Sequence, residues 1–338
     1  MNTRPPENPS PRVRAGTRGS PLALYQTRLF LSLLQEMCAE PAELFQEQII
    51  ATTGDAVQDR ALAEIGGKGL FAKEIHEALL DGRVNCAVHS LKDLETELPP
   101  GIVLACTLPR EDPRDVLIFG EAGPSNPDPA DPYAALPAGA TIGTSSVRRQ
   151  AQLLAARPDL RVVPMRGNVQ TRLRKLGEGV CQASLLALAG LKRLGMELPG
   201  AVVLQPEAMV PAAGQGIIGI TARADDTAML DLCARLQDAA SRIVAEAERA
   251  MLGVLDGSCR TPIGANARIM PDGQLILTGL VARADGSFLL KRSVHGALGG
   301  ALGGQGNGNL DARFADAAAL GRELGESLRA DAPSDLFP

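Results

Sequence analysis

The sequence lacks tryptophan and has few aromatic residues, which make up only 3% of its 338 residues. Proteins that bind single-stranded nucleic acids stack bases on aromatic side chains and present a basic surface. This chain offers little for bases to stack on, and its formal net charge is −5. The composition therefore argues against a nucleic-acid partner.

Long apolar runs are also missing. No stretch approaches the roughly 20 consecutive apolar residues that a membrane-spanning helix requires. The proline-rich, polar start over residues 1–11 lacks the apolar segment of a secretory signal. We therefore expect a cytoplasmic protein without a membrane partner.

The six cysteines stand far apart and form no C-x-x-C pair, and the chain has only three histidines. Zinc sites usually take four Cys or His ligands at short, characteristic spacings. We therefore expect no metal site, and in a reducing compartment we expect free thiols. Cys86 and Cys106 lie in apolar stretches and are predicted to be core residues.

Short apolar stretches alternate with helical patterns over the first two thirds of the chain. Such alternation is typical of α/β domains, in which helices connect parallel strands. The later stretch 217–221 is expected to return the chain to the first sheet, so that two crossings join two domains across a hinged cleft. The expected strands are 13–17, 48–52, 86–88, 115–119, 141–143, 161–165 and 184–188, and the expected helices are 22–37, 70–80, 147–156, 169–176 and 189–195.

The character of the sequence changes after about residue 234. Strands expected at 275–283 and 287–294 form a hairpin with its turn at Asp285-Gly286, and a last helix is expected over 312–328. We predict two doubly wound α/β domains that flank a cleft, followed by a small α+β C-terminal domain. The predicted domain limits are 12–108 with 214–233 for the first, 109–213 for the second and 234–330 for the third.

Basic and hydroxyl side chains gather where predicted strands end. The stretch Thr144-Ser145-Ser146-Val147-Arg148-Arg149 follows a strand and opens a helix. Its hydroxyls, free backbone N–H groups and two guanidinium groups would form an anion trap. Arg166, Arg172 and Arg193 lie close to similar junctions. On an acidic chain this pattern indicates a site for a small molecule that carries several carboxylates or phosphates.

Asp93 is the leading candidate for acid and base chemistry, because it follows an apolar strand and stands beside Lys92. The alternative is a solvated Lys-Asp pair at the end of a strand. Lys92 is also a candidate Schiff-base amine, although no glycine-rich phosphate cup accompanies it.

Cys259 is the cysteine that we choose for covalent chemistry, because it lies in a turn beside Arg260 and an adjacent cation lowers the pKa of a thiol. The alternative is an inert loop cysteine. His89 has neither an acidic partner nor a nucleophilic serine motif, so a hydrolase triad has little support. The glycine-rich stretch 66–69 lacks the Walker spacing and is interpreted as part of a flexible lid over 55–69.

Several stretches between about residues 12 and 330 match, in order, the pattern of one enzyme family. They are Thr17 to Leu24, Gly66 to Phe71, Ala87 to Asp93, Glu111 to Asp115, Gly143 to Gln150, Arg166 to Val169, Ala189 to Leu194 and Gly257 to Gly264. Through them the chain resembles the porphobilinogen deaminase family, also called hydroxymethylbilane synthases. The resemblance implies two domains similar to type II periplasmic-binding proteins and a third that holds a dipyrromethane cofactor on Cys259 through a thioether.

The resemblance also implies an activity. A monomeric enzyme would join four porphobilinogen molecules head to tail with loss of ammonia and release linear hydroxymethylbilane for tetrapyrrole synthesis. Asp93 would assist protonation of the leaving amine and stabilise the positive azafulvene that remains. The implied contacts to the cofactor or chain are Cys259, Lys92, Ser90, Gln26, Thr144, Ser145, Arg148, Arg149 and Gln215. The implied contacts to carboxylates of the substrate or growing chain are Arg18, Ser20, Arg166, Arg172 and Arg193.

Three positions depart from the family pattern. Glu95 stands where a proline is often found, and Gln182 and Ser184 stand in a strand that commonly reads Asp followed by apolar residues. Two other functions use the same features. One is a bilobed polycarboxylate-binding protein without catalysis, and the other is a pyridoxal-phosphate enzyme that uses Lys92.

Overall fold

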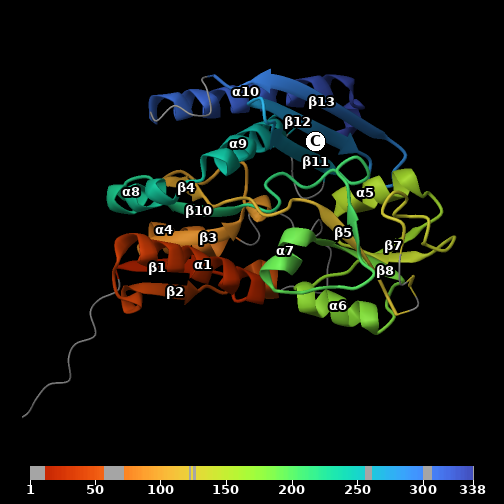
Figure 1. Cartoon of the computed structure of the whole chain (residues 1–338), viewed down its shortest axis with the longest axis horizontal. Helices are drawn as coiled ribbons and strands as arrows, with labels where there is room; N and C mark the ends of the chain where they lie inside the picture. The colour runs from red at the N-terminus through yellow and green to blue at the C-terminus, as the bar shows by residue number, and fades with distance from the viewer. Residues whose placement is uncertain are drawn as a thin grey trace, which may run out of the picture.

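The computed structural model describes residues 12–56, 72–121, 123–124, 127–255, 261–299 and 307–337. Three sheets organise these residues (Figure 1). In that view the first sheet lies at the left, the second at the right and the third across the top. No helix within the described ranges is long and apolar enough to cross a membrane.

The first sheet is mixed. Strand β1 pairs in parallel with β2 and β3, whereas β10 runs antiparallel between β3 and β4. The expected return of the chain near 217–221 is therefore confirmed. The prediction of a wholly parallel sheet is wrong. The returning strand β10 enters the sheet at the edge where the parallel strands end, so it runs in the opposite direction. In spatial order the strands are β2 (Phe45–Ile49), β1 (Val13–Thr17), β3 (Cys86–Ser90), β10 (Ile218–Arg223) and β4 (Ile102–Thr107).

The second sheet repeats this order. Strand β6 is parallel to β7 and β8, and β5 runs antiparallel between β8 and β9. Since β5 is the first strand after the chain leaves the first sheet, each sheet receives its antiparallel strand from a crossing. In spatial order the strands are β7 (Arg161–Val163), β6 (Thr141–Gly143), β8 (Ala183–Ala187), β5 (Asp115–Phe119) and β9 (Val202–Leu204).

Apolar clusters lie on both faces of these two sheets. On the first sheet, α1 and α8 join the cluster around Phe30, and α4 joins the cluster around Ile75 on the opposite face. Helix α1 begins with the Ser20 hydroxyl accepting from the Ala23 N–H at 3.3 Å. The helices of these regions are α1 (Pro21–Cys38), α2 (Thr53–Ala56), α4 (Lys73–Leu80), α5 (Val147–Ala156), α6 (Val169–Gly177), α7 (Leu188–Arg193) and α8 (Thr227–Leu236).

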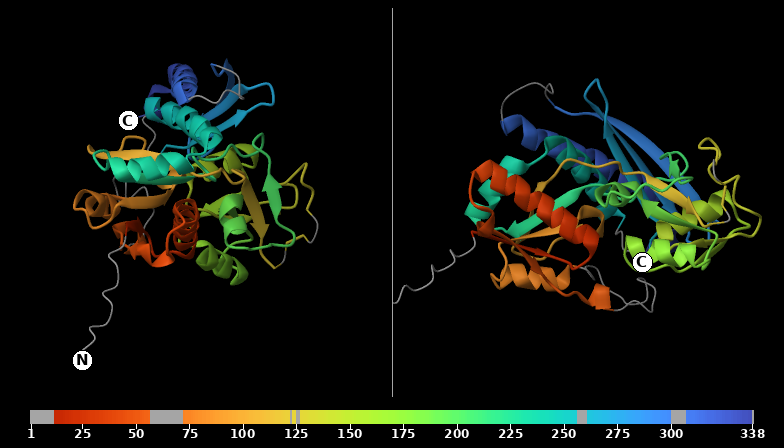
Figure 2. Two further views of the ribbon diagram at one scale, coloured as in Figure 1. Left: turned by 60° about the vertical axis from the view of Figure 1, so that its left-hand side comes forward. Right: turned by 60° about the horizontal axis from the view of Figure 1, so that its bottom comes forward.

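The third sheet is antiparallel and packs against two helices, α9 and α10. Figure 2 shows that this unit stays to one side of the other two sheets. The predicted hairpin is confirmed, whereas β9, β11 and α8 were not predicted. The elements are α9 (Ala239–Val254), β11 (Ile263–Ile269), β12 (Gln274–Ala282), β13 (Leu289–Ala297) and α10 (Asn307–Asp331), followed by a 3-10 turn, η3 (Ser334–Leu336).

One predicted strand is displaced. A strand was expected at 48–52, but β2 spans Phe45–Ile49, because the 3-10 turn η1 (Ala42–Leu44) leads directly into parallel pairing with Phe45 opposite Val13. The five cysteines in the described residues are free, and Cys86 and Cys106 are fully buried, as predicted for core residues.

The two crossings between the first and second sheets lie side by side. The Glu111 N–H donates to the Gly216 carbonyl at 3.0 Å. Gly216 has a φ of +88°, and a Cβ there would lie 2.2 Å from the Glu111 carbonyl oxygen, so only glycine fits. The fully buried Glu248 carboxylate of α9 accepts from Arg110 Nη1 at 2.8 Å and from the Gly214 N–H at 2.7 Å. Both crossings are thereby tied to the third region.

Candidate active site

Asp93 is placed by the end of β3. The strand runs directly into a 3-10 turn, η2 (Leu91–Asp93), which leaves the Asp93 side chain exposed. Asp93 lines a cavity of about 70 Å³, which we call the Asp93 cavity. Four other predicted site residues line the same cavity, namely Arg18, Ser20, Gln26 and Ser90. The first-sheet part of the predicted site is therefore brought together around one carboxylate.

Three of these residues are fixed by hydrogen bonds. The Gln26 side-chain amide donates to the Ser90 hydroxyl at 2.9 Å, which joins α1 to the end of β3. Ser20 caps the start of α1. Because the cap uses the serine oxygen only as an acceptor, its O–H remains available to donate to a ligand.

Lys92 points toward the second sheet. Its Nζ donates to Gln215 Oε1 at 3.2 Å, and Gln215 donates onward from Nε2 to Asp115 Oδ1 at 3.1 Å. Burial lowers the pKa of Lys92 to about 8, the Asp93 carboxylate opposes this change, and the Arg149 guanidinium adds to it. Near neutral pH, Lys92 is therefore still a cation, and it belongs to a different network from Asp93.

Asp115 is a functional residue that sequence reasoning missed. It is fully buried at the start of β5, and its carboxylate lies between the two neighbouring arginines of α5. Arg149 Nη2 lies 2.7 Å from Oδ1, and Arg148 Nη1 lies 2.8 Å from Oδ2. Burial alone would raise the pKa of Asp115, but the two guanidinium groups outweigh it and hold the pKa well below its ordinary value. Asp115 is thus a permanent counter-ion for the arginine pair.

The arginine pair, Arg148 and Arg149, retains hydrogen-bond donors that a ligand can use. Arg149 also donates from Nη1 to the Leu185 carbonyl at 2.8 Å, which fixes its guanidinium plane. Arg148 uses Nη1 both for Asp115 and for the Val210 carbonyl, to which it donates at 2.6 Å. Its Nε and Nη2 groups make no hydrogen bond within the described part of the chain. They stay available for a carboxylate.

The three hydroxyls of the predicted anion trap at the start of α5 differ in their hydrogen bonds. Ser146 is the N-cap and accepts from the Arg149 N–H at 3.4 Å. Thr144 accepts from the Ser146 N–H at 3.1 Å, and Ser145 Oγ is buried with no hydrogen-bond partner among the described residues. A buried hydroxyl without a partner costs free energy, so Ser145 indicates a place for a bound polar group.

Arg166 and Arg172 flank the start of α6. Gly167 has a φ of +114°, and the Asn168 side chain caps the helix by accepting from the Thr171 N–H at 2.9 Å. Burial lowers the pKa of Arg172 to about 10; Arg149 adds to this change and Asp93 opposes it. The pKa of Arg172 therefore depends both on Arg149, in α5, and on Asp93, at the end of β3.

Arg193 lies elsewhere. It ends α7 and lines a separate pocket on the outer side of α1, together with Tyr25 and Leu194. Cys259 falls outside the described residues, and so does most of the expected lid, at 57–69.

His89 is a core residue. Its Nε2 lies 3.0 Å from the Thr221 hydroxyl, and its ring lies 5.9 Å from that of His76, measured between centroids. Burial lowers the pKa of His89 to about 3, and His76 and Arg18 add to this effect. A neutral, buried imidazole of this kind supports no proton transfer near neutral pH, in agreement with the weak case for a triad.

The departures from the family pattern have local explanations. Ser184 donates to the Gly143 carbonyl at 2.8 Å, and Gln182 Oε1 accepts from the Thr141 N–H at 2.6 Å, so both tie β8 to β6. The carbonyl of Glu95 accepts from Arg249 Nη2 of α9 at 2.6 Å. The backbone that leaves η2 is therefore held by an arginine of the third region rather than by a proline ring.

Two family models match this chain. One, described as porphobilinogen deaminase, dipyromethane cofactor binding domain, matches residues 13–231, and the other, described as porphobilinogen deaminase, C-terminal domain, matches residues 243–330. The chain belongs to the porphobilinogen deaminase family. A porphobilinogen deaminase of Paracoccus denitrificans is 45% identical over 332 residues, which cover 98% of this chain and 97% of the relative. A chloroplastic porphobilinogen deaminase of Oryza sativa is 45% identical over 96% of this chain and 85% of the relative.

The similarity to solved structures is low. The substrate binding protein of an amino acid ABC transporter has a TM-score of 0.34 and 13% identity, over 66% of this chain and 90% of that one. The repeated sheet order within this porphobilinogen deaminase family member establishes its α/β class independently.

The described residues fit a dipyrromethane that carries carboxylate arms. The donor set consists of guanidinium, ammonium and hydroxyl groups, which are the partners that carboxylates take. Ser145 Oγ is buried without a partner in the described ranges, and the Arg148 donors are still open. This wall of the site is therefore complementary to an anion rather than to a neutral ring alone.

Proposed function

We propose that this chain joins four porphobilinogen molecules head to tail with loss of ammonia, and releases linear hydroxymethylbilane for tetrapyrrole synthesis. The observation that carries this proposal is the chain of contacts from Lys92 through Gln215 and Asp115 to the arginine pair. It joins the turn that bears Asp93 to the polyanion-binding wall. Nearly full-length relatives that bear the same family name support the proposal.

Asp93 is proposed as the catalytic residue. Its exposure within the Asp93 cavity gives it access to a substrate amine, to which it delivers a proton as ammonia leaves. The resulting carboxylate then stabilises the positive charge that remains on the substrate, by accepting from the pyrrole N–H. The first step requires the protonated acid, and the second requires the carboxylate. One side chain serves both steps because the first step converts the acid into the carboxylate.

The arginines are proposed to hold carboxylates. Each porphobilinogen unit brings an acetate and a propionate, so a primer of two units and four added units place twelve negative charges in one site. Arg148, Arg149 and Arg172 would neutralise these charges where water is partly excluded. Arg18, Ser20 and Arg166 would bind the carboxylates of the incoming substrate.

Cys259 is proposed as the attachment point of the dipyrromethane. When bound, this group supplies a covalent primer to which the pyrrole chain stays attached. The residues proposed to hold its carboxylates and pyrrole N–H groups are Lys92, Ser90, Gln26, Thr144, Ser145, Arg148, Arg149 and Gln215. We also propose the division into three domains at 12–108 with 214–233, 109–213 and 234–330, a monomeric state and a cytoplasmic location.

The direct test is the reaction itself. Purified protein is incubated with porphobilinogen, and both bilane and ammonia are measured. Four molecules of ammonia per bilane are expected, and the activity is expected to disappear in Cys259→Ser. Binding of porphobilinogen without ammonia release would instead support the polycarboxylate-binding protein, and a reducible imine absorbance that is lost in Lys92→Arg would support the pyridoxal-phosphate enzyme.

A further inference from the structure

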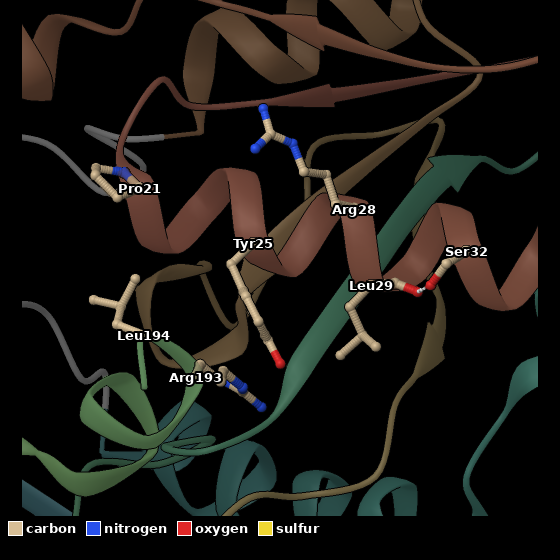
Figure 3. Close-up of a pocket in the computed structure, with 7 residues that line it drawn as sticks. All are labelled: Pro21, Tyr25, Arg28, Leu29, Ser32, Arg193 and Leu194. Carbon is tan, nitrogen blue, oxygen red and sulfur yellow. Dashed lines mark hydrogen bonds between the residues drawn. The ribbon is translucent and has the colours of Figure 1, made fainter. Parts of the chain in front are cut away.

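A second pocket opens between the first and second sheets, on the outer side of α1. Its volume is about 560 Å³, which is within the range of small-molecule sites. One wall consists of α1 residues Pro21, Tyr25, Arg28, Leu29 and Ser32, and the other is the end of α7 with Arg193 and Leu194 (Figure 3). We call it the outer pocket. None of these residues lines the Asp93 cavity.

The outer pocket has an aromatic and apolar wall. Tyr25 is 41% exposed, and its hydroxyl points toward Arg193 (Figure 3). Leu29 extends from α1 into the same space. Arg28 points away toward β2, where its Nη2 lies 2.7 Å from Glu47 Oε1. The Arg28 guanidinium is therefore paired with Glu47, and Arg193 is the cation with open donors at this pocket.

Arg193 lacks a carboxylate partner. Within the described residues its one hydrogen bond runs from Nη2 to the Gly216 carbonyl at 2.6 Å. The nearby Glu111 carboxylate is taken by the Lys192 ammonium at 2.8 Å. Burial lowers the pKa of Arg193, with Glu111 opposing the change. A partly buried guanidinium with open donors favours an anion from a ligand.

We propose that the outer pocket binds a single pyrrole ring that carries carboxylate arms. The ring packs against Tyr25 and Leu29, and one carboxylate pairs with Arg193. The identity of the ring as porphobilinogen rests on the proposed function, whereas the requirement for an apolar ring with a carboxylate follows from the pocket. Since the two walls belong to different sheets, the ligand also favours the arrangement in which α1 and α7 lie together.

The chain offers a built-in probe for this site. It contains two tyrosines and no tryptophan, and the other tyrosine, Tyr133, is buried. In a Tyr133→Phe background, tyrosine emission reports on Tyr25 alone. Holoenzyme that also carries Asp93→Asn is titrated with porphobilinogen, so that the titrant is not consumed, and acetate serves as a carboxylate without a ring. Saturable quenching by porphobilinogen but not by acetate is expected.

Charge variants then locate the binding. Arg193→Leu should weaken the quenching affinity at least ten-fold, because a charge-assisted hydrogen bond is lost. Ser32→Glu places a negative charge at the exposed rim and should weaken it several-fold, while Ser32→Gln is the neutral control and Arg28→Leu the control for loss of a cation. Unchanged affinity in both Arg193→Leu and Ser32→Glu, or no saturable quenching, would overturn the proposal.

The same titration separates this inference from the proposed function. Bilane formation by the Tyr133→Phe protein with Asp93 intact is recorded in parallel. If no bilane forms but Tyr25 is quenched with the expected variant pattern, the outer pocket stands and the polymerisation fails. If bilane forms but Tyr25 does not respond, the polymerisation stands and the outer pocket fails.

Discussion

The two walls of the site are built in opposite ways. On the second-sheet wall, Arg148 and Arg149 are buried and share the fully buried Asp115. On the first-sheet wall, Asp93 is exposed at the end of a short turn. A buried ion network keeps its geometry before any ligand arrives, whereas an exposed carboxylate can be reached by a substrate. We therefore propose that proton transfer belongs to the first-sheet wall, whereas the second-sheet wall supplies the buried arginines that neutralise the polyanion.

The largest expected effect comes from the first-sheet wall. Asp93→Asn preserves the size of the side chain but removes the proton donor and the negative charge. We expect bilane formation to fall by about 100-fold to 10,000-fold, as for loss of a general acid. The dipyrromethane content, measured by intact mass, is the control for assembly. Turnover near the wild-type rate would remove Asp93 from the mechanism.

The next effect concerns the buried wall. Asp115→Asn leaves two guanidinium groups without their counter-ion, and we expect the free energy of unfolding in urea to fall by about 3–5 kcal/mol. Because the pKa of Asp115 in the folded state lies below its ordinary value of 3.8, this stabilisation is present above that pH and is lost as the pH falls further.

The control for Asp115 is Asp115→Glu, which keeps the charge and should recover part of both stability and dipyrromethane content. If Asp115→Asn were as stable as the wild type over the whole pH range, the buried wall would not depend on this carboxylate. Should the Asn variant fail to fold, the Glu variant alone still tests the pH dependence.

Lys92 connects the two walls, and its titration should affect the pH dependence of the activity. Its pKa of about 8 lies below the ordinary value of 10.5, so the cation is present below pH 8 and is lost above it. We expect kcat/KM for porphobilinogen to decline above pH 8 and to stay level in Lys92→Arg, whose guanidinium remains charged. A decline of equal size in Lys92→Arg would assign the titration to another group.

The smallest effects distinguish two adjacent hydroxyls. Ser146→Ala removes a helix cap and should cost about 1 kcal/mol of stability. Ser145→Ala removes a buried hydroxyl that has no partner in the described structure, so stability should not fall, while dipyrromethane loading should slow a few-fold. Equal loss of stability in both variants would show that Ser145 has only a structural role.

The sequence predicted those parts of the molecule that local chemistry controls. The hydroxyl cap at the start of α5, the position of Asp93 after a strand and most strands follow from residues that lie next to one another. Asp115 could not be recognised in this way. Its partners are more than thirty residues along the chain, and they meet only because β5 lies antiparallel to β8, next to the α5 arginines. Its place in the matched stretch Glu111 to Asp115 was the available signal.

Contacts between distant parts of the chain also explain why the strand directions and the place of Arg193 were not predicted. Alternation of strands and helices indicates α/β domains, but the direction of β5 and β10 depends on which end of a sheet a crossing enters. Arg193 resembles the other arginines in sequence, since it also belongs to a helix that follows a strand. It lines the outer pocket because α7 is short and ends beside α1.

Intact-mass spectrometry of the purified protein tests the central claim most directly. The wild type should carry a dipyrrole on Cys259 and, after brief exposure to porphobilinogen, a ladder of added pyrrole units. Asp93→Asn should carry the dipyrrole, whereas its ladder should fail to extend. An active protein without any dipyrrole, or an Asp93→Asn ladder equal to that of the wild type, would contradict the division between a binding wall and a catalytic wall.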